Sequence, residues 1–181
     1  MYLDNLHKKV NLNEFEKHFK TPHQTVKKHL KEFVDSKILN VEKKARFIFY
    51  ELNLTNPLLI EYLAMCEKER LIAFLNKPLF KRLYEHISRL LVDNKIAVFG
   101  SAVSNEIFSD IDLLVISKDT EVKKTVKKFN DTYSGKPIHM VQTDAKHLTD
   151  SFITEIKKKH IFLNEHDYFI KELYKHELRM V

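Results

Sequence analysis

Apolar positions in the second half of the chain fall into short runs separated by helical patterns. Ile96–Phe99 and Ile111–Ile116 have the length and β-branched content of short buried strands, and Ile138–Val141 has the same character. Apolar residues at amphipathic spacing predict helices around these runs. The expected helices span Leu79–Val92, Thr120–Thr132 and Ala145–Lys159. The pattern predicts a small mixed α/β domain.

The first third of the chain has a different pattern, in which helices precede a pair of strands. Short helices are expected at Met1–Lys9 and Asn13–Phe19. A third begins near Thr21, a good N-cap, with Pro22 at the first helical position. Its apolar residues recur at i, i+4, i+7 and i+8 and predict a core face formed by Val26, Leu30, Phe33 and Val34.

Two expected strands, Ile38–Val41 and Phe47–Leu52, follow and are joined by a basic tip. Three helices and a hairpin in this order resemble a winged helix-turn-helix domain over residues 1–53. The resemblance implies binding to double-stranded DNA, with the third helix in the major groove and the hairpin on the backbone. It implies base contacts from Gln24, Thr25 and Lys28, and phosphate contacts from Lys27, Lys31, Lys43, Lys44 and Arg46.

The charge distribution agrees with a polyanionic partner. The formal net charge is +6, and residues 1–52 contain eleven Lys or Arg against seven Asp or Glu. No acidic residue lies between Thr21 and Lys31. Two alternatives stay open for this region: a solvated lysine face on a helix that only packs, and a dimerisation module.

Polar turn residues at Asn53–Pro57 predict a domain boundary. We therefore expect an α+β protein with three parts: the winged helix-turn-helix domain at 1–53, connecting helices at 54–92, and the mixed α/β domain at 93–181. The long helix expected at Leu58–Asn76 has more apolar residues than a linker needs, so a homodimer is a candidate assembly.

Composition points to a cytoplasmic protein without a membrane span. No apolar run approaches the ~20 residues that a transmembrane helix needs. The single cysteine, Cys66, excludes an intramolecular disulfide and a zinc site built on cysteines. This cysteine usage is typical of a reducing compartment.

The most informative residues lie between the first two apolar runs. Gly100 and Ser101 follow the first run, and Asp110 and Asp112 flank the start of the second. Residues two apart in a strand point to the same face, so the two carboxylates project side by side. Such a pair is costly without a cation, and its hard oxygen atoms suit Mg²⁺. The Gly-Ser turn offers backbone N–H groups and a hydroxyl for phosphate oxygens.

Phe99–Ser101 (FGS) and Ser109–Val115 (SDIDLLV) resemble the signature of the nucleotidyltransferase superfamily that includes DNA polymerase beta. The likeness is closest to the minimal nucleotidyltransferases and covers residues 78–170. It implies a small α/β fold, a nucleoside triphosphate (NTP) substrate and two Mg²⁺ ions. The metals would be held by Asp110 and Asp112, and the triphosphate by Gly100, Ser101 and Ser109.

Active members of that superfamily carry a third carboxylate on the next strand. The corresponding position here is His139, which can accept a proton but is a poor Mg²⁺ ligand. Asp144 lies just beyond that strand and is an alternative.

Three functions therefore stay open. The first is an Mg²⁺-dependent enzyme that transfers a nucleoside monophosphate (NMP) group to a hydroxyl of a partner protein. The second is a transcriptional regulator whose degenerate transferase domain senses a nucleotide or dimerises. The third is a DNA-binding structural protein.

Overall fold

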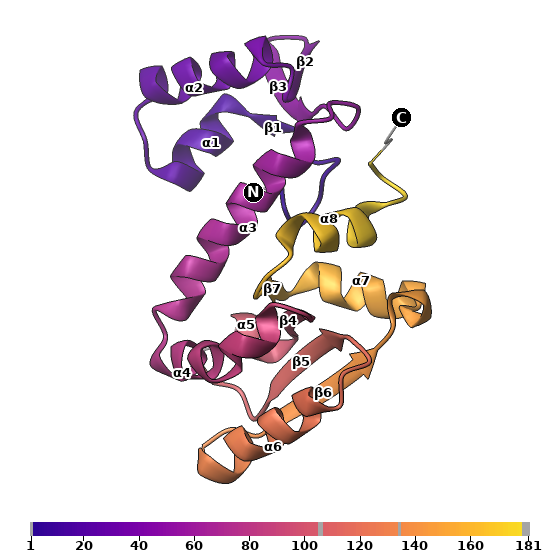
Figure 1. The fold of residues 1–181 in the computed structure, drawn as a ribbon. Coiled ribbons are helices and arrows are strands. Elements are labelled where there is room, and N and C mark those ends of the chain that lie inside the picture. The colour runs from indigo at the N-terminus through magenta and orange to yellow at the C-terminus, as the bar shows by residue number, and fades with distance from the viewer. Residues whose placement is uncertain (1, 105–106, 134, 179–181) are drawn as a thin grey trace. The chain divides into compact units, whose positions relative to one another are not determined.

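Two units make up the protein in the computed structural model, which describes residues 2–104, 107–133 and 135–178. The first unit comprises Met1–Leu63 and Tyr174–Val181, and the second comprises Ala64–Leu173. Each unit has its own β-sheet, and the elements can be followed in Figure 1.

Unit 1 is a three-stranded antiparallel sheet with two helices. Its elements are β1 (Val10–Asn11), α1 (Leu12–Phe19), α2 (His23–Asp35), β2 (Leu39–Lys44) and β3 (Phe47–Leu52). The strand order is β1-β3-β2. The hairpin of β2 and β3 pairs in continuous register from its open end at Leu39 and Leu52 to its tip at Lys44 and Phe47, which confirms the expected hairpin.

The helix expected at Met1–Lys9 is wrong for the residues that are described, because residues 2–9 form turns (Met1 lies outside the described residues). Leu3 and Leu6 are nevertheless buried, and the Tyr2 hydroxyl donates to the Tyr50 carbonyl at 2.8 Å. Apolar burial and long-range hydrogen bonds thus hold this segment in place without a helix. Two helices, not three, precede the hairpin in residues 2–52.

Of the two helices before the hairpin in unit 1, α1 has a side-chain cap at its start and α2 does not. At α1 the Asn11 side chain accepts from the Glu14 backbone N–H, and the Glu14 side chain reaches back to the Asn11 N–H, which is a capping box. Thr21 is not the N-cap of α2, because its hydroxyl donates to the Phe19 carbonyl and Pro22 occupies the cap position. A local turn therefore uses the hydroxyl that was expected to cap the helix.

Unit 2 is a four-stranded mixed sheet covered by helices. Its strands are β4 (Lys95–Phe99), β5 (Ile111–Ile116), β6 (Ile138–Thr143) and β7 (His160–Phe162). Their order is β6-β5-β4-β7, with β5 parallel to β6 and β4 antiparallel to both of its neighbours. The helical elements are α3 (Leu59–Leu75), α4 (Pro78–Ile87), η1 (Ser88–Leu91), α5 (Ser101–Ser104), α6 (Glu121–Thr132), η2 (Ala145–His147), α7 (Asp150–Lys158) and α8 (His166–Tyr174). The first turn of α3 and the last residue of α8 belong to unit 1.

Strand alternation gives the sheet of unit 2 two different faces. Ile111, Leu113 and Val115 of β5 are fully buried in a core that includes residues of α4 and α6 (Figure 1). Asp112 and Leu114 point to the opposite face. On that face Phe99 of β4 lies beside Asp112 in the strand register, and its ring packs edge-on against Phe152 of α7. One strand therefore serves both the core and the carboxylate site.

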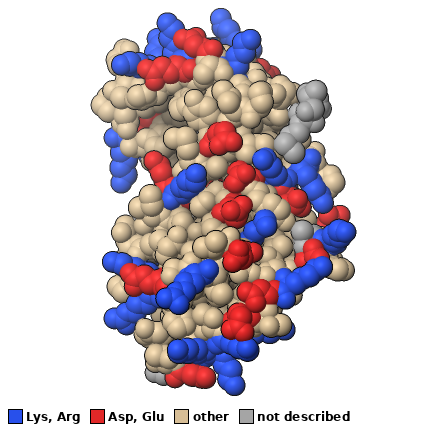
Figure 2. All heavy atoms as spheres, in the orientation of Figure 1, with Lys and Arg blue, Asp and Glu red and all other residues tan. Residues whose placement is uncertain are grey.

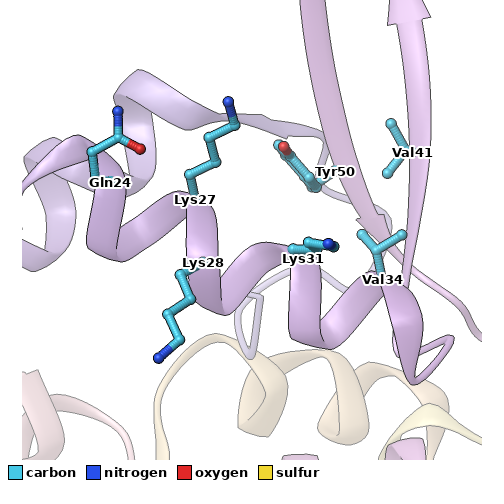
Figure 3. A pocket seen from close by; sticks show the side chains of 7 residues that line it. All are labelled: Gln24, Lys27, Lys28, Lys31, Val34, Val41 and Tyr50. Atoms are coloured by element: carbon cyan, nitrogen blue, oxygen red, sulfur yellow. The ribbon is translucent and has the colours of Figure 1, made fainter.

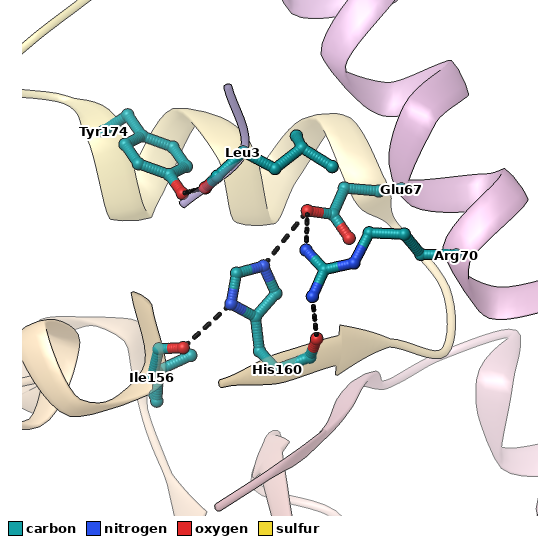
Figure 4. A network of polar contacts seen from close by, with 6 residues as sticks. All are labelled: Leu3, Glu67, Arg70, Ile156, His160 and Tyr174. Atoms are coloured by element: carbon teal, nitrogen blue, oxygen red, sulfur yellow. Dashed lines mark hydrogen bonds and ion pairs between the residues drawn. The ribbon is translucent and has the colours of Figure 1, made fainter. Parts of the chain in front are cut away.

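A buried polar network lies within unit 2 (Figure 4). His160 and Glu67 have side chains that are only 1% exposed, and His160 Nε2 lies 3.1 Å from Glu67 Oε1. Arg70 donates to the same carboxylate oxygen at 3.0 Å and to the His160 carbonyl at 3.1 Å. His160 Nδ1 contacts the Ile156 carbonyl at 2.8 Å. The network ties α3 to β7 and to the end of α7.

A separate hydrogen bond in Figure 4 belongs to unit 1. The Tyr174 hydroxyl donates to the Leu3 carbonyl at 2.6 Å, across 171 positions of sequence. This bond fastens the last residue of α8 to the segment that precedes β1.

Replacing Glu67 by Ala is expected to destabilise the protein strongly, because Arg70 loses its ion-pair partner and the buried His160 loses a hydrogen-bond partner. Removing one partner of a buried ion pair costs about 3–5 kcal/mol. The lower end of that range is expected, since the Arg70 side chain is 29% exposed and gains water. Chemical denaturation measures the free energy of unfolding. The matched control is Glu69→Ala, an exposed position on the same helix, which should change it by about 0.5 kcal/mol or less. Equal effects of the two variants would contradict the role given to Glu67.

Candidate functional site

Gly100 adopts a backbone conformation that the site requires. It follows β4 directly with φ of 75°, in the left-handed region that favours glycine. A Cβ at this position would lie 2.6 Å from Asp112 Oδ2, inside van der Waals contact. The Gly100 N–H donates to the Lys159 carbonyl at 3.1 Å, which connects the turn to the end of α7. The close approach that requires glycine here is made by the carboxylate of Asp112.

Asp110 and Asp112 lie at the start of β5, as the spacing predicts. Asp112 is the second residue of the strand and lies opposite Phe99 of β4 and His139 of β6. Partial burial raises the pKa of Asp112 above its ordinary value, and the charge of Asp110 raises it further. His139 acts in the opposite direction, and Glu155 adds a smaller increase. Like charges thus face each other here, which is the condition that a bound cation relieves.

His139 lies beside this pair. Its Nδ1 is 3.5 Å from Asp110 Oδ2, and the side chain is 63% exposed. The parallel register places it next to Asp112 on β6, at the position that the alternation of β6 predicts. A neutral imidazole here can accept a proton from a hydroxyl that approaches from solvent.

Asp144 lies at the other end of the sheet. It follows β6, whereas Asp112 is near the start of the parallel strand β5. Its carboxylate pairs with Lys118 at 3.3 Å, and that contact lowers its pKa. Asp144 is therefore not the third acid of this site.

The two serines expected at the triphosphate lie on either side of the loop. Ser101 is the first residue of α5, and Ser109 directly precedes Asp110. The Gly100 N–H is already bonded to the Lys159 carbonyl, so the hydroxyl and backbone N–H of Ser101, at the start of α5, are the donors at this turn that we assign to a phosphate.

The donor set of the pair suits a hard cation such as Mg²⁺, since both side chains are carboxylates on one face. Among residues 2–104, 107–133 and 135–178, no three or more His, Cys, Asp or Glu side chains are arranged to hold a metal ion.

Sequence reasoning missed Glu155, an exposed residue of α7 that acts electrostatically on Asp112. No local pattern marks it, because its position depends on how α7 packs. That packing is set by the contact of Phe152 with Phe99 and by the hydrogen bond from Gly100 to Lys159.

The basic residues of unit 1 line a groove between α2 and the hairpin. This groove has a volume of about 470 Å³ and is lined by Gln24, Lys27, Lys28, Lys31, Val34, Val41 and Tyr50. Figure 3 shows Lys27 and Lys31 on the side of α2 that faces Tyr50, whereas the ammonium group of Lys28 points away from the strands. Four of the residues expected at a DNA interface thus share one concave surface.

The other residues expected to contact DNA differ from one another in their surroundings. Thr25 is exposed on α2 and is not part of the groove lining. Lys44 is paired with Glu42 at 3.1 Å, and the Arg46 guanidinium lies 5.2 Å from the centre of the Phe47 ring. Lys43 pairs with Ile48 in the hairpin register and shares with Val41 and Tyr50 the face toward the groove.

Surface charge elsewhere is mixed. Figure 2 shows Lys and Arg side chains interspersed with Asp and Glu over the visible face. Net positive charge alone therefore does not locate an interface. Within the described part of the chain, no helix combines the length and the hydropathy that crossing a membrane requires.

A family model described as a nucleotidyltransferase domain matches residues 80–178, which is more than half of the chain. The match includes Gly100, Asp110, Asp112 and His139. No curated protein and no solved structure gives a significant match.

Replacing Gly100 by Ala is expected to weaken both the fold and the carboxylate site. The new Cβ collides with Asp112 Oδ2, and the backbone becomes strained, which costs about 1–3 kcal/mol. Thermal unfolding checks the stability, and Mn²⁺ titration checks the site. The control is Gly135→Ala, since nothing lies within 4 Å of a Cβ at Gly135. A Gly100→Ala protein as stable as the control would show that the close approach is not a constraint.

Proposed function

The chain belongs to the nucleotidyltransferase domain family, and we propose that it binds an NTP with Mg²⁺ and transfers the NMP group to a hydroxyl of a partner molecule. The observation that carries the proposal is the carboxylate pair at the start of β5, in which Asp112 lies against Gly100 of the Gly-Ser turn that follows the paired strand β4. The pKa of Asp112, raised first by burial and then by the charge of Asp110, supports it, because a nearby cation favours the ionised carboxylates.

Each residue of the site has a separate task in this proposal. Asp110 and Asp112 hold the divalent cation, and Ser101 and Ser109 contact the phosphates. A bound Mg²⁺ supplies positive charge that stabilises the attacking and leaving oxygen atoms. Gly100 keeps the turn close to Asp112, so that the phosphates and the carboxylates stay within reach of one another.

The transfer is a displacement at the α-phosphorus of the NTP. The acceptor hydroxyl oxygen forms a bond to that phosphorus, and the bond to the oxygen that bridges to the β-phosphate breaks. Pyrophosphate leaves with the electron pair. The hydroxyl proton passes to the imidazole of His139, which is exposed beside Asp110.

The alternative is a regulator in which the same site binds an NTP without turnover and serves for sensing or dimerisation. General-base assistance is worth roughly 10²–10⁴-fold in rate. The two functions therefore differ in whether His139 removes the proton of the acceptor hydroxyl efficiently. NTP binding without transfer would favour the alternative.

A second function, DNA binding by unit 1, is favoured by the groove between α2 and the hairpin. Three lysines line it, and Tyr50 and two valines form its apolar part. Lys43 extends the same face. Ammonium groups around a concave surface suit a phosphate backbone, and double-stranded DNA is the proposed partner.

Incubation with labelled NTPs and Mn²⁺, beside candidate acceptor proteins and DNA, tests the transferase function. We expect covalent labelling of an acceptor by the wild type and its loss in Asp112→Asn. In His139→Asp the rate should rise by roughly 10-fold or more, because a carboxylate serves both as ligand and as base. Wild-type protein that binds NTP in calorimetry but labels nothing would establish the sensing alternative instead.

Gel-shift titration across salt tests the DNA-binding function. Three phosphate contacts, from Lys27, Lys31 and Lys43, give a slope of log affinity against log salt of about −2.7. Lys27→Glu/Lys31→Glu should abolish binding at low salt. The control Lys8→Glu/Lys17→Glu changes charge equally at exposed residues outside the groove and should retain most of it. Equal loss in both double variants would mean that total charge, not the groove, governs binding.

A further inference from the structure

Helix α3 has apolar side chains on two opposite sides. Leu63 and Phe74 are buried on one side. On the other side Leu58, Met65 and Ile72 are 56%, 62% and 66% exposed. A surface helix normally confines its apolar residues to the side that faces the core. A second apolar side, open to solvent, is typical of a helix that packs against a partner.

The three exposed residues form one straight row. Helix α3 is continuous (Figure 1), so helical geometry fixes positions along it whichever unit each residue belongs to. Leu58 lies one residue before α3, and its carbonyl accepts the Tyr62 N–H with helical spacing at 3.2 Å. Residues seven apart are separated by about two helical turns and face the same direction. The row of Leu58, Met65 and Ile72 is therefore symmetric about Met65.

Such a row fits an identical row that runs in the opposite direction. A two-fold axis at Met65 brings the two Met65 side chains together and places Leu58 against Ile72 of the second copy. Antiparallel helices at the ordinary packing distance of about 8–10 Å bury both rows in this way. The exposed side of α3 is thus complementary to itself, as the interface of a two-fold dimer must be.

The polar residues beside the row favour the same arrangement. Glu61, four residues before Met65, and Lys68, three residues after it, lie on one flank of the row. Equal flanks meet in an antiparallel pair, so Glu61 comes opposite Lys68 of the second copy, with an axial offset of about 1.5 Å. Tyr62 and Glu69 meet in the same way on the other flank. Among the described residues, no ion pair joins Glu61 or Lys68 to another side chain.

We infer that the exposed side of α3 is an interface between two copies of this chain, packed antiparallel about Met65. The occupant is a second copy because a single two-fold rotation makes both the apolar row and the flanking charges complementary. The interface uses no residue of the carboxylate site and none of the groove in unit 1. Its test is therefore independent of nucleotide binding and of DNA binding.

Sedimentation equilibrium of the full chain over a range of concentrations tests the inference. We expect a wild-type dimer that dissociates on dilution. Met65→Asp should raise the dimer Kd by about 10-fold or more, because it buries two like charges together on the axis. The control is Val92→Asp, which makes the same change at an apolar residue that is 80% exposed and outside α3. This control should leave the Kd unchanged.

Charge reversal tests the antiparallel arrangement. Glu61→Lys and Lys68→Glu each place like charges opposite one another twice in the dimer, so each should raise the Kd by about 5-fold or more. An equimolar mixture of the two variants should recover dimers, because each variant supplies the charge that the other lacks. Glu85→Lys reverses an exposed charge on α4 and serves as the control.

The single cysteine of the chain makes a covalent test possible. Met65→Cys/Cys66→Ala leaves one thiol, on the two-fold axis, where packed helices bring the Cα atoms within the range of a disulfide. Oxidation should give a covalent dimer of this variant and none of Val92→Cys/Cys66→Ala.

Three results would overturn the inference. The first is wild-type protein that stays monomeric at the highest concentration reached. The second is a dimer whose Kd is unchanged by Met65→Asp. The third is a dimer that Met65→Asp disrupts but that neither charge reversal weakens, since the helices would then not pack in the proposed direction. Circular dichroism shows whether each variant is folded.

Discussion

The contact between Gly100 and the carboxylate of Asp112 is the constraint on which the site depends. The distance from the Cβ position to Oδ2 leaves no room for a side chain, and φ of 75° excludes most residues on its own. The chain contains only two glycines, and Gly135 has open space around it. The turn after β4 therefore cannot move away from Asp112 without breaking the bond to Lys159 or the register with β5.

This constraint couples fold and chemistry through a single strand. The buried residues of β5 hold the sheet against α4 and α6, and the alternate residues carry the charge. A one-residue shift of register would turn Asp112 into the apolar core and expose Leu113, so the core itself fixes which way the carboxylate points. The burial that raises the pKa of Asp112 follows from the same packing. Because the strand is well packed, Asp112 is partly buried, and its ionised form costs free energy that a nearby cation would offset.

Local pattern was sufficient for much of this arrangement. The bounds of β5 and the side-by-side placement of Asp110 and Asp112 follow from alternation alone, and so does the position of His139. Glu155, whose charge adds to the raised pKa of Asp112, could not be found in this way, because it lies on α7, far from β5 in the sequence. The helix expected before Asn11 failed for a similar reason. Residues 2–9 gain their burial from contacts with β3 and with Tyr174, which a local helical period does not reveal.

The same alternation separates the charges of the hairpin in unit 1. Glu42 and Lys44 share one face of β2 and form an ion pair. Lys9 pairs with Glu42 as well, and also with Glu51 of β3. Val41 and Lys43 share the other face, where Tyr50 and Ile48 lie opposite them. The basic tip therefore does not act as one cationic surface, because Lys44 is compensated and Lys43 is on the side of the groove. In the described part of the chain, Lys43 and the lysines of α2 that line the groove form no ion pair, whereas Lys44 does. Strand alternation, more than total charge, therefore determines which lysine of the hairpin tip is left without a carboxylate partner.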